Sequence, residues 1–147
     1  MPPANLGQLL VQMQYPGMTW VESQITRAWI SRHGAEYDEL MFNVRLGDGA
    51  QIEGEFTPEI IRMATLISQK RADMVARTGD QVDIVEVKVR IAFPVIGQLL
   101  GYRGLWQRDH PEMPVRRLVA VGRSVVPDMG PIIEESGVII ETFPREE

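Results

Sequence analysis

The stretch RADMVARTGDQVDIVEVKVR, residues 71–90, decides the fold of this chain. Two runs rich in Val, Ile and Met flank the turn signal RTGDQ, a pattern typical of a β-hairpin. With a two- or four-residue loop centred between Gly79 and Asp80, paired positions sum to 159, so Asp73 lies directly opposite Glu86. A three-residue loop would shift the register by one residue and weaken this pairing of the two acids.

Charged side chains share one face of the hairpin. Because side chains alternate along a strand, Glu86 and Lys88 lie on the same face, and Asp73 joins them with about 5 Å between opposed Cβ atoms. Two facing carboxylates repel each other unless a cation lies between them. The arrangement indicates either a solvated face with one salt bridge or a site for a divalent metal such as Mg²⁺. The opposite face is expected to build the core through Val85, Val87 and Val89.

The composition is typical of one globular domain: 147 residues, 44% hydrophobic and 24% charged. Without Cys, disulfides, thiolate metal sites and Cys nucleophiles are excluded. The net charge is −5, but residues 69–123 hold 10 basic and 6 acidic side chains, so a local basic face can meet phosphate. Lys88 is one of two lysines among 15 basic residues. No signal peptide and no apolar run of about 20 residues is evident, so we expect a soluble, cytoplasmic protein without membrane contact.

The order of elements predicts a mixed β-sheet with helices on its faces, an α/β fold. Thr19 is a good N-cap and Gly34 a plausible end for the first helix, and Thr57 followed by Pro58 begins a second helix. The sequence GDG predicts a turn between two short strands. The expected elements are a helix over 19–34, a hairpin over 39–56, a helix over 58–69, the hairpin of 71–90, a helix over 94–107, a strand over 115–125, a short helix over 128–136 and a strand over 137–143.

The acidic pattern resembles the PD-(D/E)xK nuclease superfamily. Asp73, then twelve residues, then Glu86-Val87-Lys88 match its motif, with Ala72 in place of the nominal Pro. The helix that follows carries GQLLGY, which is similar to the Gln-x-x-x-Tyr helix of the exonuclease-type branch. Its glycines suggest that this helix lies very close to the sheet or to a substrate.

The resemblance implies a restriction-endonuclease-like core, helix–three strands–helix–strand (α-β-β-β-α-β), in one domain over 1–147, with an N-terminal extension over 1–18 and an inserted helix over 57–70. It implies metal binding by Asp73 and Glu86, catalysis by both acids with Lys88, and contacts of Gln98 and Tyr102 with the nucleic-acid backbone. Many members add a Glu from the first helix. Glu22 is the candidate third acid, and TWVE also reads as a capping box in which Glu22 binds the Thr19 N–H.

The function expected from these residues is metal-dependent hydrolysis of DNA phosphodiester bonds, with Mg²⁺ or Mn²⁺ as cofactor. An alternative is a non-catalytic structural or assembly protein built on a nuclease fold, for example in a phage particle, where it would be virion-associated. A dimeric junction-resolving or restriction-like endonuclease is a further option, with a homo-oligomer formed through the helix at 58–69 or the N-terminal segment. Arg116, Arg117 and Arg123 flank a strand and are either phosphate contacts or surface charge.

Overall fold

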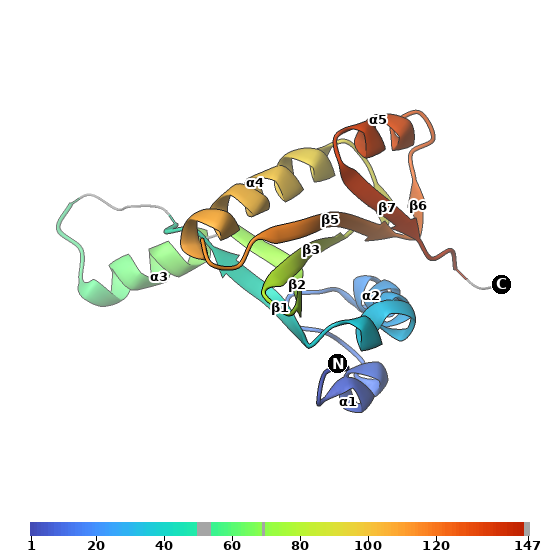
Figure 1. The fold of residues 1–147 in the computed structure, drawn as a ribbon. Helices are drawn as coiled ribbons and strands as arrows, with labels where there is room; N and C mark the ends of the chain where they lie inside the picture. The colour runs from blue at the N-terminus through green and yellow to red at the C-terminus, as the bar shows by residue number, and fades with distance from the viewer. Residues whose placement is uncertain (50–53, 69, 146–147) are drawn as a thin grey trace.

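The computed structural model describes residues 1–49, 54–68 and 70–145. The described chain forms a mixed α/β domain in which helices lie on both faces of a central sheet (Figure 1). In chain order, its elements are α1 (Leu6–Val11), α2 (Trp20–His33), a 3₁₀ turn (Gly34–Glu36), β1 (Glu39–Leu46), α3 (Pro58–Ser68), β2 (Lys70–Thr78), β3 (Gln81–Val87), β4 (Arg90–Ile91), α4 (Pro94–Asp109), β5 (Val115–Gly122), β6 (Ser124–Val125), α5 (Gly130–Glu135) and β7 (Val138–Thr142).

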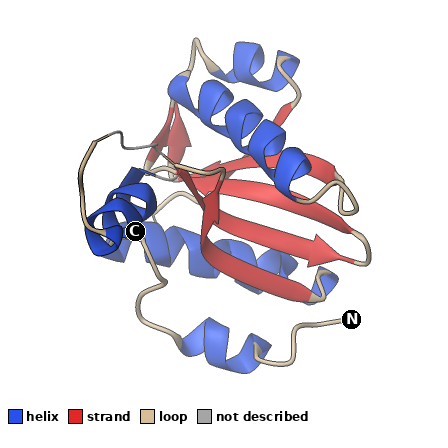
Figure 2. Cartoon of the chain, turned by 90° about the vertical axis from the view of Figure 1, so that its left-hand side faces the viewer, coloured by secondary structure: helices blue, strands red, loops and turns tan. Residues whose placement is uncertain are grey.

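The five strands of the main sheet run in the order β1-β2-β3-β5-β7. β1, β2 and β3 pair antiparallel, whereas β5 and β7 add in parallel after helical crossovers through α4 and α5. Figure 2 shows helices above and below this sheet. One buried cluster joins the sheet to α1 and α2, and a second joins it to α4. The predicted α/β class with a mixed central sheet is therefore confirmed.

The register predicted for residues 71–90 is also confirmed. Thr78 pairs with Gln81 and Met74 pairs with Val85, so a two-residue turn at Gly79 and Asp80 connects β2 and β3. Gly79 adopts a φ of 60°, which glycine accepts without steric cost. Continuing the pairing by one residue beyond Met74 and Val85 sets Asp73 opposite Glu86.

Local sequence signals place the helices well. Thr19 and Glu22 form the predicted capping box at the start of α2, with the Thr19 N–H donating to Glu22 Oε1 at 2.8 Å. The Thr57 hydroxyl accepts from the Ile60 N–H at the start of α3. α3 projects away from the sheet (Figure 1). No helix in the described part of the chain combines the length and apolar composition needed to cross a membrane.

Three expectations differ from the structure. β1 pairs with β2 rather than with a strand after the GDG turn, and residues 54–57 are not extended in a ladder; residues 50–53 lie outside the described part. Val89 is 47% exposed and lies beyond the end of β3 at Val87, so it does not belong to the core. Gly34 continues into a 3₁₀ turn with a φ of −56° rather than adopting the left-handed conformation of a stop.

A buried ion pair fixes the far end of β3. Asp83 is fully buried and accepts two hydrogen bonds from Arg116, at 3.0 and 2.7 Å. The Tyr37 hydroxyl donates to the same carboxylate at 2.6 Å. The pair joins β3, β5 and the segment before β1, and every oxygen of the buried acid has a partner, as burial of a charge requires.

We therefore expect Arg116→Ala to lower the free energy of unfolding by about 2–3 kcal/mol, because it leaves the Asp83 charge buried with Tyr37 as its remaining partner. Arg117→Ala, one position along the same strand and exposed, is the matched control and should change stability by less than about 0.5 kcal/mol. Urea denaturation monitored by tryptophan fluorescence measures both. Equal midpoints for the two variants would contradict a stabilising role of this pair.

Candidate active site

The hairpin of β2 and β3 brings the two predicted acids together on the face that α4 covers. Glu86 is 3% exposed, near the end of β3. The carboxyl groups of Asp73 and Glu86 lie close enough that Asp73 disfavours ionisation of Glu86 and so raises its pKa. Asp73 is also held in place by the backbone, since its Oδ2 accepts from the Val87 N–H at 2.8 Å. The register of the hairpin thus produces a pair of adjacent carboxyl groups.

Two further side chains reach the same carboxyl group. Lys88, directly after β3, places its Nζ 3.7 Å from Glu86 Oε2 and remains partly exposed. The Tyr102 hydroxyl, from α4, donates to Glu86 Oε2 at 3.3 Å. Asp73, Glu86, Lys88 and Tyr102 are called the acid cluster below. The structure therefore brings together four of the residues predicted from the sequence.

The environment of Glu86 favours its neutral form. The pKa of Glu86 is raised to about 8: burial is the largest cause and Asp73 adds to it, while Lys88 and Tyr102 act in the opposite direction. The proton is therefore held on Glu86, since a like charge nearby disfavours its ionised form. A cation placed beside the two carboxyl groups would replace this proton and favour the ionised form of Glu86.

The acid cluster leaves oxygen atoms available for such a cation. Glu86 Oε1 and, on α4, Gln98 Oε1 are buried and have no hydrogen-bond partner among the described residues. Buried oxygens are otherwise almost always paired. Carboxylate and amide oxygens are the ligands that hard cations prefer, and Mg²⁺ takes one or two carboxylates and fills its other positions with water or phosphate. The residues present fit a magnesium-type ion.

The number of acids limits what the cluster can hold. Across the described residues, no group of three or more His, Cys, Asp or Glu side chains forms a metal site. Glu22, the candidate third acid, instead accepts the Thr19 N–H in its capping box. The geometry thus favours an ion bound through two carboxylates over one enclosed by protein ligands.

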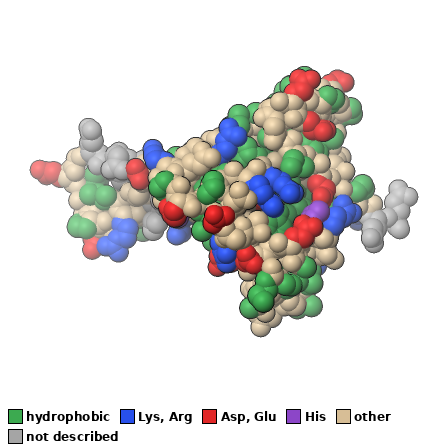
Figure 3. Space-filling model, viewed as in Figure 1, with side chains coloured by type: hydrophobic (Ala, Val, Ile, Leu, Met, Phe, Trp, Pro, Cys, Tyr) green, Lys and Arg blue, Asp and Glu red, His purple; other side chains and the backbone are tan. Residues whose placement is uncertain are grey.

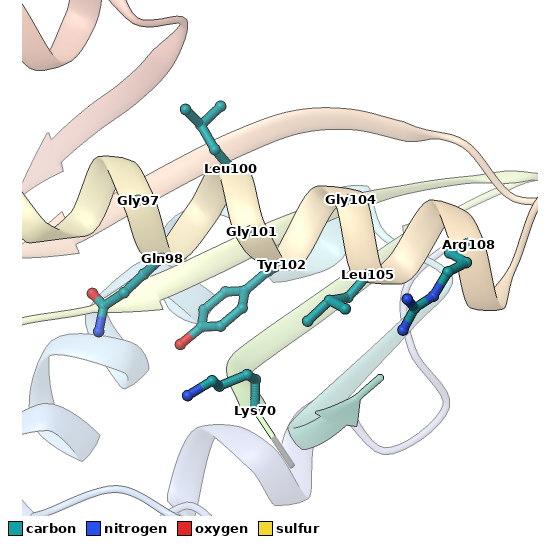
Figure 4. Close-up of a pocket in the computed structure, with 9 residues that line it drawn as sticks. All are labelled: Lys70, Gly97, Gln98, Leu100, Gly101, Tyr102, Gly104, Leu105 and Arg108. Atoms are coloured by element: carbon teal, nitrogen blue, oxygen red, sulfur yellow. The ribbon is translucent and has the colours of Figure 1, made fainter. Parts of the chain in front are cut away.

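A cleft with a volume of 610 Å³ lies beside the acid cluster, along one face of α4 (Figure 4). Gln98 and Tyr102 project into it from the helix, and Lys70, at the start of β2, reaches toward it from below. The residues that line it are Lys70, Gly97, Gln98, Leu100, Gly101, Tyr102, Gly104, Leu105 and Arg108. The cleft therefore connects the two predicted substrate-contacting residues with two cations.

The α4 glycines do not pack against the sheet. A Cβ atom added at Gly97, Gly101 or Gly104 would meet nothing within 4 Å. Of the two predicted neighbours, the sheet is therefore excluded, because these residues line the cleft, and close approach of a substrate stays a prediction. Three glycines lower the stability of one helix. Because they have no side chains, they leave open space beside Gln98 and Tyr102.

Lys70 and Arg108 are residues that the sequence reasoning missed. They are 38 positions apart, and only the packing of α4 across the sheet makes them neighbours of one cleft. One signal was present: the chain has two lysines, and Lys70 lies three residues before Asp73 on the same strand. Both lysines border the candidate site. Acidic and basic side chains are interspersed over the face drawn in Figure 3, so this face has no extended patch of positive charge.

Comparison with solved structures finds proteins that resemble this architecture. A repair endonuclease from Pyrococcus abyssi superposes with a TM-score of 0.51 and 13% sequence identity, over 92% of this chain and 50% of that one. EndoMS in complex with double-stranded DNA gives a TM-score of 0.47 and 12% identity, with the same coverage. The chain spans about half the length of these proteins. No family model and no curated protein matches the sequence.

These observations define the fold class: a restriction-endonuclease-like α/β domain, in which a mixed five-stranded sheet is flanked by helices. The repair endonuclease from Pyrococcus abyssi shares this architecture at a TM-score of 0.51.

The raised pKa of Glu86 predicts a specific pH dependence. The folded chain holds the Glu86 proton up to about pH 8, whereas the unfolded chain releases it near the ordinary value of 4.5. The contribution of Glu86 to stability is thus complete below pH 4.5 and is lost as the pH rises to about 8. In EDTA, urea midpoints of the wild type should fall over this range more steeply than those of Glu86→Gln.

Magnesium provides the second half of this test. At pH 8, Mg²⁺ should raise the unfolding midpoint of the wild type, since a ligand that binds the folded state stabilises it, and should leave that of Glu86→Gln unchanged. Parallel pH profiles for the two proteins, or equal responses to Mg²⁺, would contradict a protonated Glu86 that a cation can displace.

The open space beside Gly101 of α4 and the close backbone contact at Gly122 of β5 predict opposite effects of alanine substitution on stability. Gly101→Ala should raise the free energy of unfolding by about 0.5–1 kcal/mol, because alanine is the better helix former and its Cβ meets nothing within 4 Å. Gly122→Ala is the matched control: its Cβ would collide with the Lys88 carbonyl oxygen, which should cost about 1–3 kcal/mol. Thermal unfolding by circular dichroism measures both, and a destabilised Gly101→Ala would show that this face of α4 is packed.

Proposed function

We propose that this protein is a metal-dependent deoxyribonuclease that hydrolyses phosphodiester bonds at the acid cluster, with Mg²⁺ or Mn²⁺ as cofactor. One observation carries the proposal: Glu86 Oε1 is buried without a partner beside a second carboxyl group. A side chain in this state destabilises the folded protein unless a ligand completes it. Asp73 and Glu86 would hold the metal, which supplies Lewis-acid activation of a phosphate and of a bound water.

The protein side chains have separate roles in this proposal. The Lys88 ammonium, 3.7 Å from Glu86 and partly exposed, can hold the attacking water by a hydrogen bond and stabilise negative charge that develops on the phosphate. Tyr102 donates to Glu86 Oε2 and so fixes the orientation of the carboxyl group, leaving Oε1 free. Asp73 is oriented by the Val87 N–H in the same way.

The cleft along α4 provides a path for the substrate. Its volume of 610 Å³ begins beside Tyr102 and extends along the glycine face to Arg108. Lys70 and Arg108 supply positive charge there, and phosphate contacts of this kind give sequence-independent affinity. The glycines let a sugar–phosphate backbone approach the helix closely, and Gln98 would contact it beside the metal.

The fold supports the same proposal at a coarser level. The Pyrococcus abyssi protein that shares this architecture is a repair endonuclease. At 13% identity this likeness concerns the fold, and a fold can host several functions. The acid cluster, with its unpartnered buried carboxylate oxygen, is therefore the stronger support.

The two lysines provide the decisive comparison. Lys88→Ala should lower kcat for cleavage of labelled DNA by about 10²–10⁴-fold, since it removes a group that acts on the reacting atoms. Lys70→Ala changes the charge equally but lies in the cleft, so it should raise KM and leave kcat within a few fold. Cleavage assays with Mg²⁺ or Mn²⁺ and short labelled duplexes or single strands measure both.

Two results would overturn the proposal. DNA that stays intact with the wild type at all Mg²⁺ and Mn²⁺ concentrations would favour the structural alternative. Undiminished cutting by Lys88→Ala would remove the acid cluster from the reaction.

A further inference from the structure

A second cavity, on the opposite face of the sheet from the acid cluster, is lined by arginines. Its volume is 510 Å³, and it lies between the face of α2 that bears Gln24 and Arg32 and the segment after β7. Arg32, Arg123 and Arg145 line it, and none of its described lining residues is acidic. We call these three side chains the arginine pocket.

The central guanidinium of this pocket is held by neutral groups. Arg123 Nη1 donates to the Phe143 carbonyl at 3.3 Å and Nη2 donates to Gln24 Oε1 at 3.0 Å. Arg123 is partly buried, and no carboxylate among the described residues lies within ion-pair distance of it. Its orientation is therefore fixed while its charge is not neutralised, and its remaining N–H groups can serve an anion.

The other two arginines are more exposed. Arg32 lies over the ring of Phe143, with its Cζ 4.4 Å from the centroid, and approaches Glu141 at 3.7 Å. That carboxylate offsets part of the charge of Arg32. Arg145 is exposed, and no ion pair within the described chain involves it. The pocket thus carries more positive than negative charge. Arg116, by contrast, is neutralised by the buried carboxylate of Asp83.

The backbone connects this pocket to the acid cluster. The Arg123 N–H donates to the Val89 carbonyl, and the Lys88 N–H donates to the Val121 carbonyl. Arg123 and Lys88 therefore lie just beyond the carboxyl ends of two neighbouring parallel strands, where Arg123 contacts Gln24 of α2 and Lys88 contacts Glu86. A long polyanion bound at this end of the strands can contact both sites.

We infer that the arginine pocket binds a backbone phosphate of the nucleic acid that is hydrolysed at the acid cluster, an inference that rests on the proposed function. Guanidinium groups bind phosphate through paired N–H donors.

The test measures binding without cleavage. Fluorescence anisotropy with a labelled DNA oligonucleotide, in EDTA, gives the dissociation constant over a series of salt concentrations. Arg32→Gln/Arg145→Gln removes two exposed charges from the pocket. It should weaken binding and make the slope of log K against log salt shallower by about 0.9 per lost contact on a duplex, or about 0.7 on a single strand.

The matched control is Arg45→Gln/Arg62→Gln, which removes the same charge from exposed positions on β1 and α3, outside the pocket. Its slope should stay close to that of the wild type. Arg123→Lys is a second variant, in which the charge remains but the paired donors are lost, and it should also weaken binding. Circular dichroism of each variant separates loss of binding from loss of fold.

The outcomes distinguish this inference from the proposed function. Equal slopes for the pocket variant and the control variant would overturn the inference, whether or not the wild type cuts DNA. A shallower slope for the pocket variant alone would support it, even if the wild type proves inactive. If inorganic phosphate at constant ionic strength stabilises the wild type while DNA binding is unchanged in the pocket variant, the pocket serves free phosphate and the inference is overturned.

Discussion

The central constraint in this structure is that two acids face each other across one antiparallel strand pair, and one of them is almost completely buried. Burying Glu86 beside Asp73 opposes the ionisation that Glu86 would undergo in water. The neighbouring elements are arranged around this pair: Lys88 leaves the strand next to it, Tyr102 reaches it from α4, and the cleft opens at its side. The features that distinguish this sheet from an ordinary scaffold lie within reach of the two carboxyl groups.

A comparison within β3 shows what is unusual about Glu86. Asp83, three residues earlier, is also buried, but two hydrogen bonds from Arg116 and one from Tyr37 satisfy it. Glu86 lies on the other face with a lysine at 3.7 Å and one oxygen without a partner. The same strand thus carries one acid completed by the protein and one left incomplete. The first is typical of a structural ion pair, and the second is typical of a ligand site.

The sequence predicts those parts of the molecule that depend on local chemistry. Thr19 and Glu22 encode a cap within four residues, and Gly79 with Asp80 encodes the turn that sets Asp73 against Glu86. The features that were missed depend on segments far apart in the chain. β1 pairs with β2, which follows it only after α3. Lys70 and Arg108 line one cleft because α4 packs across the sheet. Arg32, Arg123 and Arg145 line one pocket because α2 lies beside the segment after β7. Periodicity and turn signals carry no information about such long-range contacts, so they could not decide whether the α4 glycines lie against the sheet or beside a cleft.

The tight turn at Gly79 and Asp80 has a consequence for how this protein can change. It lies at the far end of the hairpin from the acids, six residues before Glu86, in a position where surface loops usually tolerate insertions. Here one added residue that slipped the pairing would rotate Glu86 to the α2 side and leave Asp73 without its neighbour. The length of this distant, exposed loop therefore sets the register of the hairpin, and the hairpin register in turn determines whether Asp73 and Glu86 lie side by side.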